Sequence, residues 1–260
     1  MLGAIVGDIV GSVHEFTRTK TKDFPLFTTE ASFTDDTVLT LAVADWLLTG
    51  NDLIDLLQDA YAAHPLAGFG GGFNRWSRKR SREPYGSYGN GSAMRVSPVG
   101  FAFDDLGDVL AWAKKSAEVT HDHPEGIRGA QATAAAIWYA RRERDRDVIR
   151  TALEARFGYD LSTPLDTIRP DYEFDVTCQG SVPQALRAFL EATSFEDAIR
   201  NAVSLGGDAD TMAAITGGVA EAYWSGVPGD IATTALARLE AGQREVVSRF
   251  RERYTGATSA

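Results

Sequence analysis

The chain has 260 residues, of which 44% are hydrophobic and 24% are charged, and its formal net charge is −10. These values describe a globular protein with a sizeable core, and the negative charge argues against nonspecific nucleic-acid binding. The single cysteine, Cys178, cannot form an internal disulfide, so we expect a reducing compartment such as the cytoplasm. The apolar start MLGAIVGDIVG is short and is interrupted by Asp8, so we expect neither a signal peptide nor a membrane span.

Helical periodicity dominates the sequence. We expect helices over residues 34–48, 53–64, 105–119, 124–146, 194–204, 208–224 and 228–254. Two long segments, 67–100 and 160–184, are predicted to be non-helical, and segments of that length inside a compact domain are usually functional. Few stretches alternate as strands do, and no βαβ rhythm is visible. The sequence therefore predicts an all-α protein with one domain over residues 1–260.

Two of the expected helices begin with an unusual density of oxygen-bearing side chains. The first start is TDDT at residues 34–37, and the second is DADT at residues 208–211. Helix capping accounts for one or two of these oxygens, because Asp and Thr accept hydrogen bonds from the free N–H groups of the first turn. Several carboxylates side by side are unfavourable unless a positive charge lies between them. Capping remains the alternative, but the recurrence of the pattern favours a metal site.

The donors in these two segments indicate a hard cation. Carboxylate and hydroxyl oxygens suit Mg²⁺, Mn²⁺ or Ca²⁺, whereas Cys178, His121 and His123 do not form a zinc-ligand pattern. Two helix starts together supply enough oxygens for a pair of ions about 3.5–4 Å apart. The positive end of each helix dipole opposes a cation by only about 0.3–1 kcal/mol, which full carboxylate charges outweigh.

Five sequence blocks occur in an order that resembles the ADP-ribosylglycohydrolase family. They are GDIVGSVHEF, FTDDT, YGSYGNGSAMRVSPVG, VTHDHPEGIRGAQATAAAI and SLGGDADTMAAITGGVAEAYWSG, and they span roughly residues 1 to 225. The resemblance implies a compact orthogonal bundle of helices with a binuclear Mg²⁺ or Mn²⁺ centre in a cleft. It also implies hydrolysis of the bond between C1 of the distal ribose of ADP-ribose and an acceptor, such as an arginine or serine side chain or a small molecule.

The resemblance assigns roles to individual residues. The implied metal ligands are Thr34, Asp35, Asp36, Asp208, Asp210 and Thr211, the set that ligand chemistry also indicates. The implied catalytic residues are Glu15 and Asp36, with Glu15 the candidate for water activation or proton transfer. Without the family, Glu15 reads as a solvated loop carboxylate. Asp8 matches a family Gly-Asp pair and is expected to orient its neighbours.

The glycine-rich segment is expected to bind the substrate. Its backbone N–H groups can approach a diphosphate closely, because glycine permits the required dihedral angles. The candidate substrate-binding residues are Gly70, Gly72, Phe73, Gly86, Ser87, Tyr88, Asn90, Gly91 and His121. The aromatic residues Phe73 and Tyr88 are candidates for stacking on the adenine or ribose. The alternative interpretations are a flexible surface loop and, for His121, a helix cap.

The sequence thus predicts a metal-dependent hydrolase that reverses ADP-ribosylation; it leaves the oligomeric state open, with a monomer favoured. Three other classes remain open: a protein that binds ADP-ribose or blocks a partner sterically, as an immunity protein does; a structural protein that kept the fold; and a different two-metal hydrolase such as a phosphoesterase. The basic residues between Arg75 and Arg82 are interpreted as a solvated surface rather than a substrate-steering patch.

Overall fold

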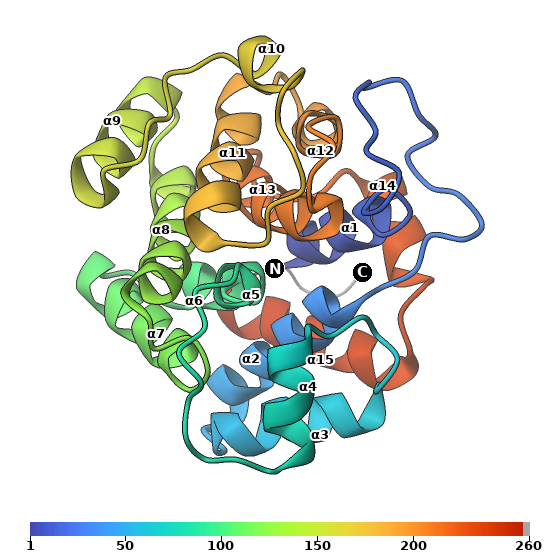
Figure 1. Cartoon of the computed structure of the whole chain (residues 1–260), viewed down its shortest axis with the longest axis vertical. Coiled ribbons are helices and arrows are strands. Elements are labelled where there is room, and N and C mark those ends of the chain that lie inside the picture. Colours follow the sequence, from blue (N-terminus) through green and yellow to red (C-terminus); the bar gives the residue numbers. More distant parts are fainter. Residues whose placement is uncertain (257–260) are drawn as a thin grey trace.

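The N-terminal apolar segment forms a buried helix that packs along a second buried helix from the other end of the sequence. In the computed structural model, which describes residues 1–256, α1 (Leu2–Gly11) is buried over its whole length. Its partner is α13 (Ala209–Tyr223), which is buried from its first residue to Ala222. Both helices lie near the middle of the molecule in Figure 1. Burial at the centre of the core therefore accounts for the apolar character of the N-terminal segment.

Glycines allow the backbones of α1 and α13 to touch. Gly3, Gly7 and Gly11 are spaced four residues apart, so they share one face of α1. A methyl group on Gly7 would stand 2.0 Å from the carbonyl oxygen of Ala213, and one on Gly11 would stand 2.4 Å from the Cα of Asp210. Only hydrogen fits at such positions, so this stripe fixes how closely the two helices pack.

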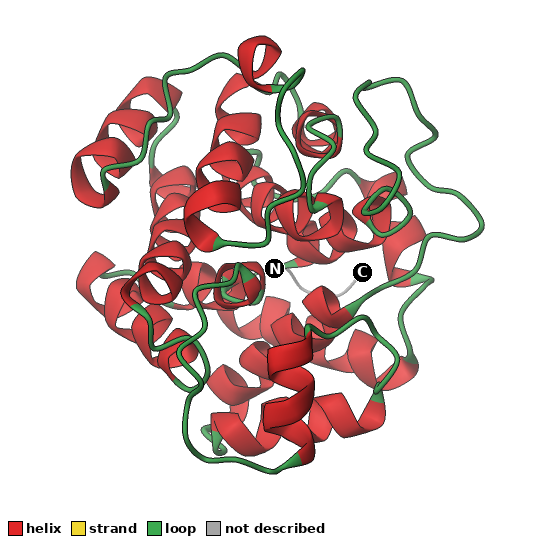
Figure 2. Ribbon diagram, in the orientation of Figure 1, coloured by secondary structure: helices red, strands yellow, loops and turns green. Residues whose placement is uncertain are grey.

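The remaining helices surround this pair, as Figure 2 shows. They are α2 (Asp35–Thr49), α3 (Leu53–Ala63), α4 (Gly71–Arg78), α5 (Gly91–Met94), α6 (Ser97–Ala102), α7 (Leu106–Glu118), α8 (Pro124–Arg142), α9 (Arg146–Phe157), α10 (Leu165–Ile168), α11 (Cys178–Glu191), α12 (Phe195–Val203), α14 (Gly229–Leu236) and α15 (Ala241–Tyr254). Residues 1–256 contain no strand, only a single bridge between Gly89 and Thr177. The all-α prediction is confirmed.

Four of the expected segments differ from the structure. The segment 228–254 forms two helices, because Glu240 and Gln243 make a capping box that starts α15 separately. The segment 67–100 contains α4, α5 and α6, whose short lengths leave little periodicity to read in the sequence. The segment 160–184 contains α10 and the first half of α11, which begins where the Thr177 side chain accepts a hydrogen bond from the Gly180 N–H.

The helix expected over residues 124–146 is also divided. It ends at Arg142, and Asp145 caps a further helix, α9, that sequence reasoning did not anticipate. The Asp145 side chain accepts hydrogen bonds from the N–H groups of Asp147 and Val148. An Asp followed by a charged first turn is a recognised start signal, whereas the helical pattern over residues 124–146 predicts a continuation of α8.

The basic residues that follow Arg75 are largely engaged with the helix beside them. Arg80 forms an ion pair with Asp59, and Arg82 forms pairs with Asp52 and Asp55, all exposed and all on or next to α3. These contacts agree with a solvated surface. No helix among residues 1–256 has the length and apolar character needed to cross a membrane.

Replacing Gly7 by alanine tests the contact between α1 and α13. The methyl group would collide with the Ala213 carbonyl, and overpacking of this kind costs about 1–3 kcal/mol or more. We expect Gly7→Ala to lower the melting temperature by roughly 2–12 °C, measured by calorimetry. Gly242→Ala is the matched control, because Gly242 lies in α15 with open space where its methyl group would stand. Equal melting temperatures for the two variants would contradict the close packing.

Candidate active site

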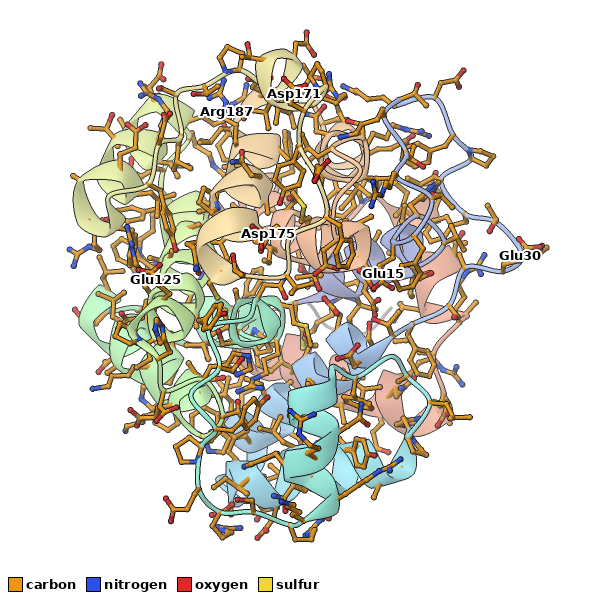
Figure 3. All side chains as sticks on the ribbon, viewed as in Figure 1. Glu15, Glu30, Glu125, Asp171, Asp175 and Arg187 are labelled. Atoms are coloured by element: carbon orange, nitrogen blue, oxygen red, sulfur yellow. The ribbon has the colours of Figure 1, made fainter. Side chains whose placement is uncertain are left out.

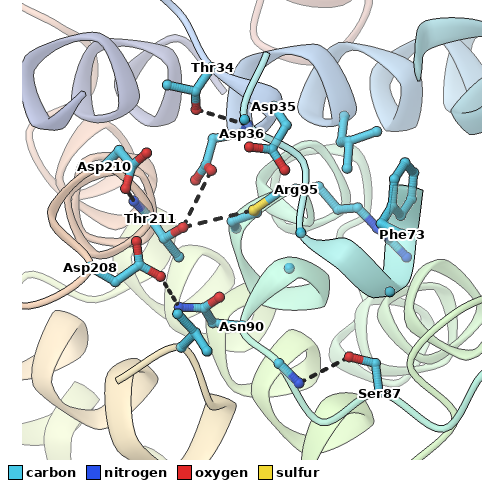
Figure 4. Close-up of a pocket in the computed structure, with 18 of the residues that line it drawn as sticks. Thr34, Asp35, Asp36, Phe73, Ser87, Asn90, Arg95, Asp208, Asp210 and Thr211 are labelled. Atoms are coloured by element: carbon cyan, nitrogen blue, oxygen red, sulfur yellow. Dashed lines mark hydrogen bonds between the residues drawn. The ribbon is translucent and has the colours of Figure 1, made fainter. Parts of the chain in front are cut away.

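The two acidic helix starts meet at the base of one pocket. Thr34 caps α2, and Asp208 occupies the equivalent position before α13. The Thr211 hydroxyl donates a hydrogen bond of 3.3 Å to Oδ2 of Asp36, which joins the two starts directly (Figure 4). Segments 175 residues apart in sequence therefore present their carboxylates to a common space.

Asp8 on α1 holds the first of these starts in position. Its Oδ1 accepts a hydrogen bond of 2.7 Å from the Thr34 hydroxyl, and its Oδ2 accepts bonds from the backbone N–H groups of Thr34 (2.9 Å) and Thr37 (3.0 Å). Both oxygens are thus committed to the first turn of α2. Although Asp8 lies close enough to Asp36 and Asp210 to share a cation, these bonds favour the orienting role expected from the sequence.

A second group of carboxylates lies next to the first. Glu15, Asp208 and Asp210 each offer an oxygen within 4.8 Å of the others, as do Asp8, Asp36 and Asp210. Asp210 belongs to both groups, so it is placed to bridge two positions. Asp208 is further oriented by Asn90, whose Nδ2 donates to its Oδ2 at 2.7 Å. The arrangement offers two adjacent oxygen-lined positions.

Burial and mutual repulsion make these carboxylates hard to ionise on their own. Burial first, and then the charge of Asp210, raise the pKa of Asp35 and of Asp36 well above the usual range. Burial raises the pKa of Asp208 to about 6, and burial together with Asp210 raises that of Glu15 to about 7. A cluster of this kind stores unfavourable free energy that positive charge would relieve.

The residues present fit a divalent cation. Asp36 has a buried Oδ1 with no hydrogen-bond partner in the described chain, although buried carboxylate oxygens are normally satisfied. The neighbouring donors are carboxylates and hydroxyls, the ligands that Mg²⁺ and Mn²⁺ prefer. Helix capping accounts for the Thr34 hydroxyl, which accepts the Asp36 N–H, but it leaves Oδ1 of Asp36 without a partner in the described chain.

The carboxylates of Asp35, Asp36, Asp208 and Asp210 form the floor of the pocket, which has a volume of about 320 Å³. Fourteen of the sixteen residues predicted for the site line it; the two that do not are Gly86 and Tyr88. Tyr88 is 48% exposed and lies against the ring of His123 outside the lining. Phe73 is buried and lines the wall, stacked on Phe69, so its ring is largely covered by protein.

The glycine-rich wall is held by backbone bonds from two other segments. The Thr120 carbonyl accepts from the N–H groups of Tyr85 and Ser87, and the Val176 carbonyl accepts from Asn90. These bonds join residues 85–90 to the end of α7 and to the start of α11. The wall is therefore a loop held in place by backbone hydrogen bonds. This differs from the flexible surface loop that was the alternative interpretation of the sequence.

Glu15 lies in the turn that follows α1, and its side chain lines the pocket. It is half-buried and lines the cavity, whereas Glu30, in the loop that follows, lies at the edge of the molecule (Figure 3). The solvated-loop interpretation of Glu15 is therefore wrong for its position. Its carboxylate faces the same space as Asp208 and Asp210.

Sequence reasoning missed two lining residues with chemical importance. Tyr85 and Arg95 both line the pocket, and the Arg95 side chain is completely buried. The one available signal was the position of Arg95 in AMRVSPVG, a lone charge in an otherwise apolar and small-residue run. A charged side chain in such a run is either exposed to solvent or buried with hydrogen-bond partners, and only the tertiary structure distinguishes the two.

The chain is similar to known proteins over most of its length. A family model described as ADP-ribosylglycohydrolase matches residues 1–258. The chain is 26% identical to ADP-ribosylhydrolase ARH3 of Mus musculus, covering 86% of this chain and 82% of that protein. It is equally similar to ARH3 of Homo sapiens, with 26% identity over 86% of this chain and 84% of the relative.

A solved structure is similar over nearly its whole length. It is an ADP-ribosylglycohydrolase-related protein complex, 27% identical in sequence, with a TM-score of 0.70 and coverage of 97% of this chain and 96% of the other. Fold, sequence and the order of the motifs agree. The chain belongs to the ADP-ribosylglycohydrolase family.

Proposed function

We propose that this protein is a metal-dependent hydrolase that cleaves the bond between C1 of the distal ribose of ADP-ribose and an acceptor. The observation that carries the proposal is the convergence of Asp36, Asp208 and Asp210 beneath a glycine-lined pocket. An acidic floor alone would suit many two-metal hydrolases, including a phosphoesterase. Membership of the family and the braced glycine wall favour a nucleotide-sugar substrate.

The ligands proposed for two Mg²⁺ or Mn²⁺ ions are Thr34, Asp35, Asp36, Asp208, Asp210 and Thr211. When bound, such ions supply positive charge that orders substrate hydroxyls and lowers the pKa of a water molecule. Asp8 orients the Thr34 side chain by accepting a hydrogen bond from its hydroxyl, and Asn90 orients Asp208 by donating a hydrogen bond to its carboxylate. Replacing partners of this kind typically costs about 10–100-fold in metal affinity or activity.

Glu15 is proposed as the residue that accepts a proton from the attacking water. The new bond forms between the water oxygen and C1, the bond from C1 to the acceptor breaks, and the acceptor atom gains a proton. The transition state carries positive charge on the sugar, as in other glycoside cleavages. A carboxylate on the pocket side of the ribose stabilises that charge, and Glu15 is the half-buried carboxylate that reaches the cavity from outside the two helix starts.

Hydrolysis of defined substrates tests the proposal. Peptides carrying ADP-ribosyl-arginine or ADP-ribosyl-serine are incubated with the protein in EDTA, Mg²⁺ or Mn²⁺, and free ADP-ribose is quantified. We expect release only with a divalent cation, and loss of at least about 100-fold in Asp210→Asn, the scale seen when an activating group is removed. Asp45→Asn is the matched control, because Asp45 lies on α2 outside both carboxylate groups.

The same assay separates the alternative functions. With a protein that only binds ADP-ribose, or that only blocks a partner, neither peptide would release free ADP-ribose. A phosphoesterase would release phosphate or split the diphosphate. Equal turnover in EDTA and in Mg²⁺ would contradict the metal role while leaving glycohydrolase activity intact.

Thermal stability gives a second test that does not depend on turnover. Mg²⁺ at 100 times its Kd should stabilise the folded state by about 2.7 kcal/mol, which raises the melting temperature by roughly 5–10 °C. In EDTA, Asp36→Asn should melt higher than the wild type, because it removes a carboxyl group that burial and its neighbours make unfavourable to ionise. The same variant should lose most of the increase caused by Mg²⁺. A wild-type protein whose melting temperature ignores both EDTA and Mg²⁺ would oppose the proposed ligand set.

A further inference from the structure

Beneath the glycine wall, three buried side chains form a continuous hydrogen-bonded chain. Arg95 is fully buried, and its Nη2 donates to the Ser116 carbonyl at 2.7 Å and to the Thr120 hydroxyl at 2.9 Å. The Thr120 hydroxyl lies 2.8 Å from Nδ1 of His121. Arg95 is labelled in Figure 4 beside the carboxylates of the floor. The chain ends at an imidazole that lines the pocket.

The direction of the protons along this chain follows from the donor inventory. A guanidinium can only donate, so the Thr120 oxygen must accept from Arg95. The Thr120 hydroxyl is completely buried and has one proton of its own, and Nδ1 of His121 is the only acceptor for it among its hydrogen-bond partners in the described chain. If Nδ1 carried a hydrogen instead, the Thr120 proton would be buried without an acceptor, which is unfavourable. Nδ1 is therefore the acceptor.

The doubly protonated form of His121 is disfavoured by its surroundings. Burial, and then the charge of Arg95, lower the pKa of His121 well below its ordinary value. The remaining hydrogen of a neutral ring lies on Nε2. That atom has no protein partner in the described chain and is the ring atom nearest to Gly91, where a methyl group would stand 3.2 Å from it.

We propose that Arg95 and Thr120 are positioning residues that hold His121 as the neutral tautomer protonated on Nε2, so that it donates a hydrogen bond to an anionic oxygen of bound ADP-ribose. The ligand's identity rests on the proposed function, whereas the tautomer rests on the buried chain alone. His121 in this state is a fixed donor. It neither accepts a proton at Nε2 nor releases one near neutral pH, so proton transfer falls to Glu15.

This assignment explains why an arginine is buried under the pocket. Lysine at position 95 would also donate, but its flexible point charge would not fit two acceptors with the planar geometry of a guanidinium. The unpartnered Nε and Nη1 of Arg95 leave its positive charge only partly screened. That charge lines the same pocket as the carboxylates, where it favours an anionic ligand and disfavours an imidazolium.

Ring-nitrogen NMR on the wild-type protein tests the tautomer directly. We expect one of the four histidines to show an unprotonated Nδ1 and a protonated Nε2 that stay unchanged between pH 6 and 8, with the signal assigned by its absence in His121→Gln. Thr120→Val, which keeps the shape but removes the hydroxyl, should give a mixture of tautomers, whereas Thr120→Ser should retain one. A protonated Nδ1 or an imidazolium at pH 7 in the wild type would overturn the proposal.

Affinity for ADP-ribose, measured by calorimetry with Mg²⁺ present, tests the donor role. His121→Gln still offers an N–H group and should bind within about threefold of the wild type, whereas His121→Phe should bind about tenfold more weakly, the loss of one hydrogen bond to a charged group. Equal binding by both variants would overturn the donor role. A wild-type protein that binds no ADP-ribose would overturn the proposed function, while the ring-nitrogen measurement still decides the tautomer.

Discussion

The site depends on the backbone contact between α1 and α13. Because Gly11 allows α1 to lie against the backbone of Asp210, the carboxylate of Asp8, one turn earlier on α1, reaches the first turn of α2. A single helix thus sets the distance between two clusters of oxygen atoms that come from opposite ends of the sequence. A methyl group on the contact face would separate them by about the width of a carbon atom, more than a ligand set tolerates.

The electrostatic cost of the floor is the second constraint. Buried carboxylates that share a pocket are stable as ions only when a positive charge compensates them, and the helix N-termini behind Asp36 and Asp210 supply only part of it. Rotating the side chains into solvent would relieve the repulsion, but the bonds to Asp36 from Thr211 and to Asp208 from Asn90 prevent this. The protein therefore gives up stability to keep these carboxylates in place, as functional sites commonly do.

Sequence reasoning predicted the parts of the site that depend on local chemistry. The starts of α2 and α13 were found because their oxygens lie within four residues of one another, and the long helices because their periodicity repeats. The short helices α5 and α10 were missed, since one turn has no period to detect. Arg95 was missed for another reason: its burial follows from the packing of α5, α7 and α8, which no spacing in the sequence encodes.

The pocket is lined both by carboxylates and by the cation of Arg95, so under the proposed function the binding of cation and nucleotide would be linked. An anionic diphosphate near Asp208 and Asp210 would be repelled while those carboxylates carry no cation, even though Arg95 and the proposed Nε2–H of His121 would attract it. A cation on the floor removes that repulsion, so each ligand should raise the affinity for the other by the same factor. Under the proposed function, the nucleotide would therefore bind tightly only when the cation is also bound.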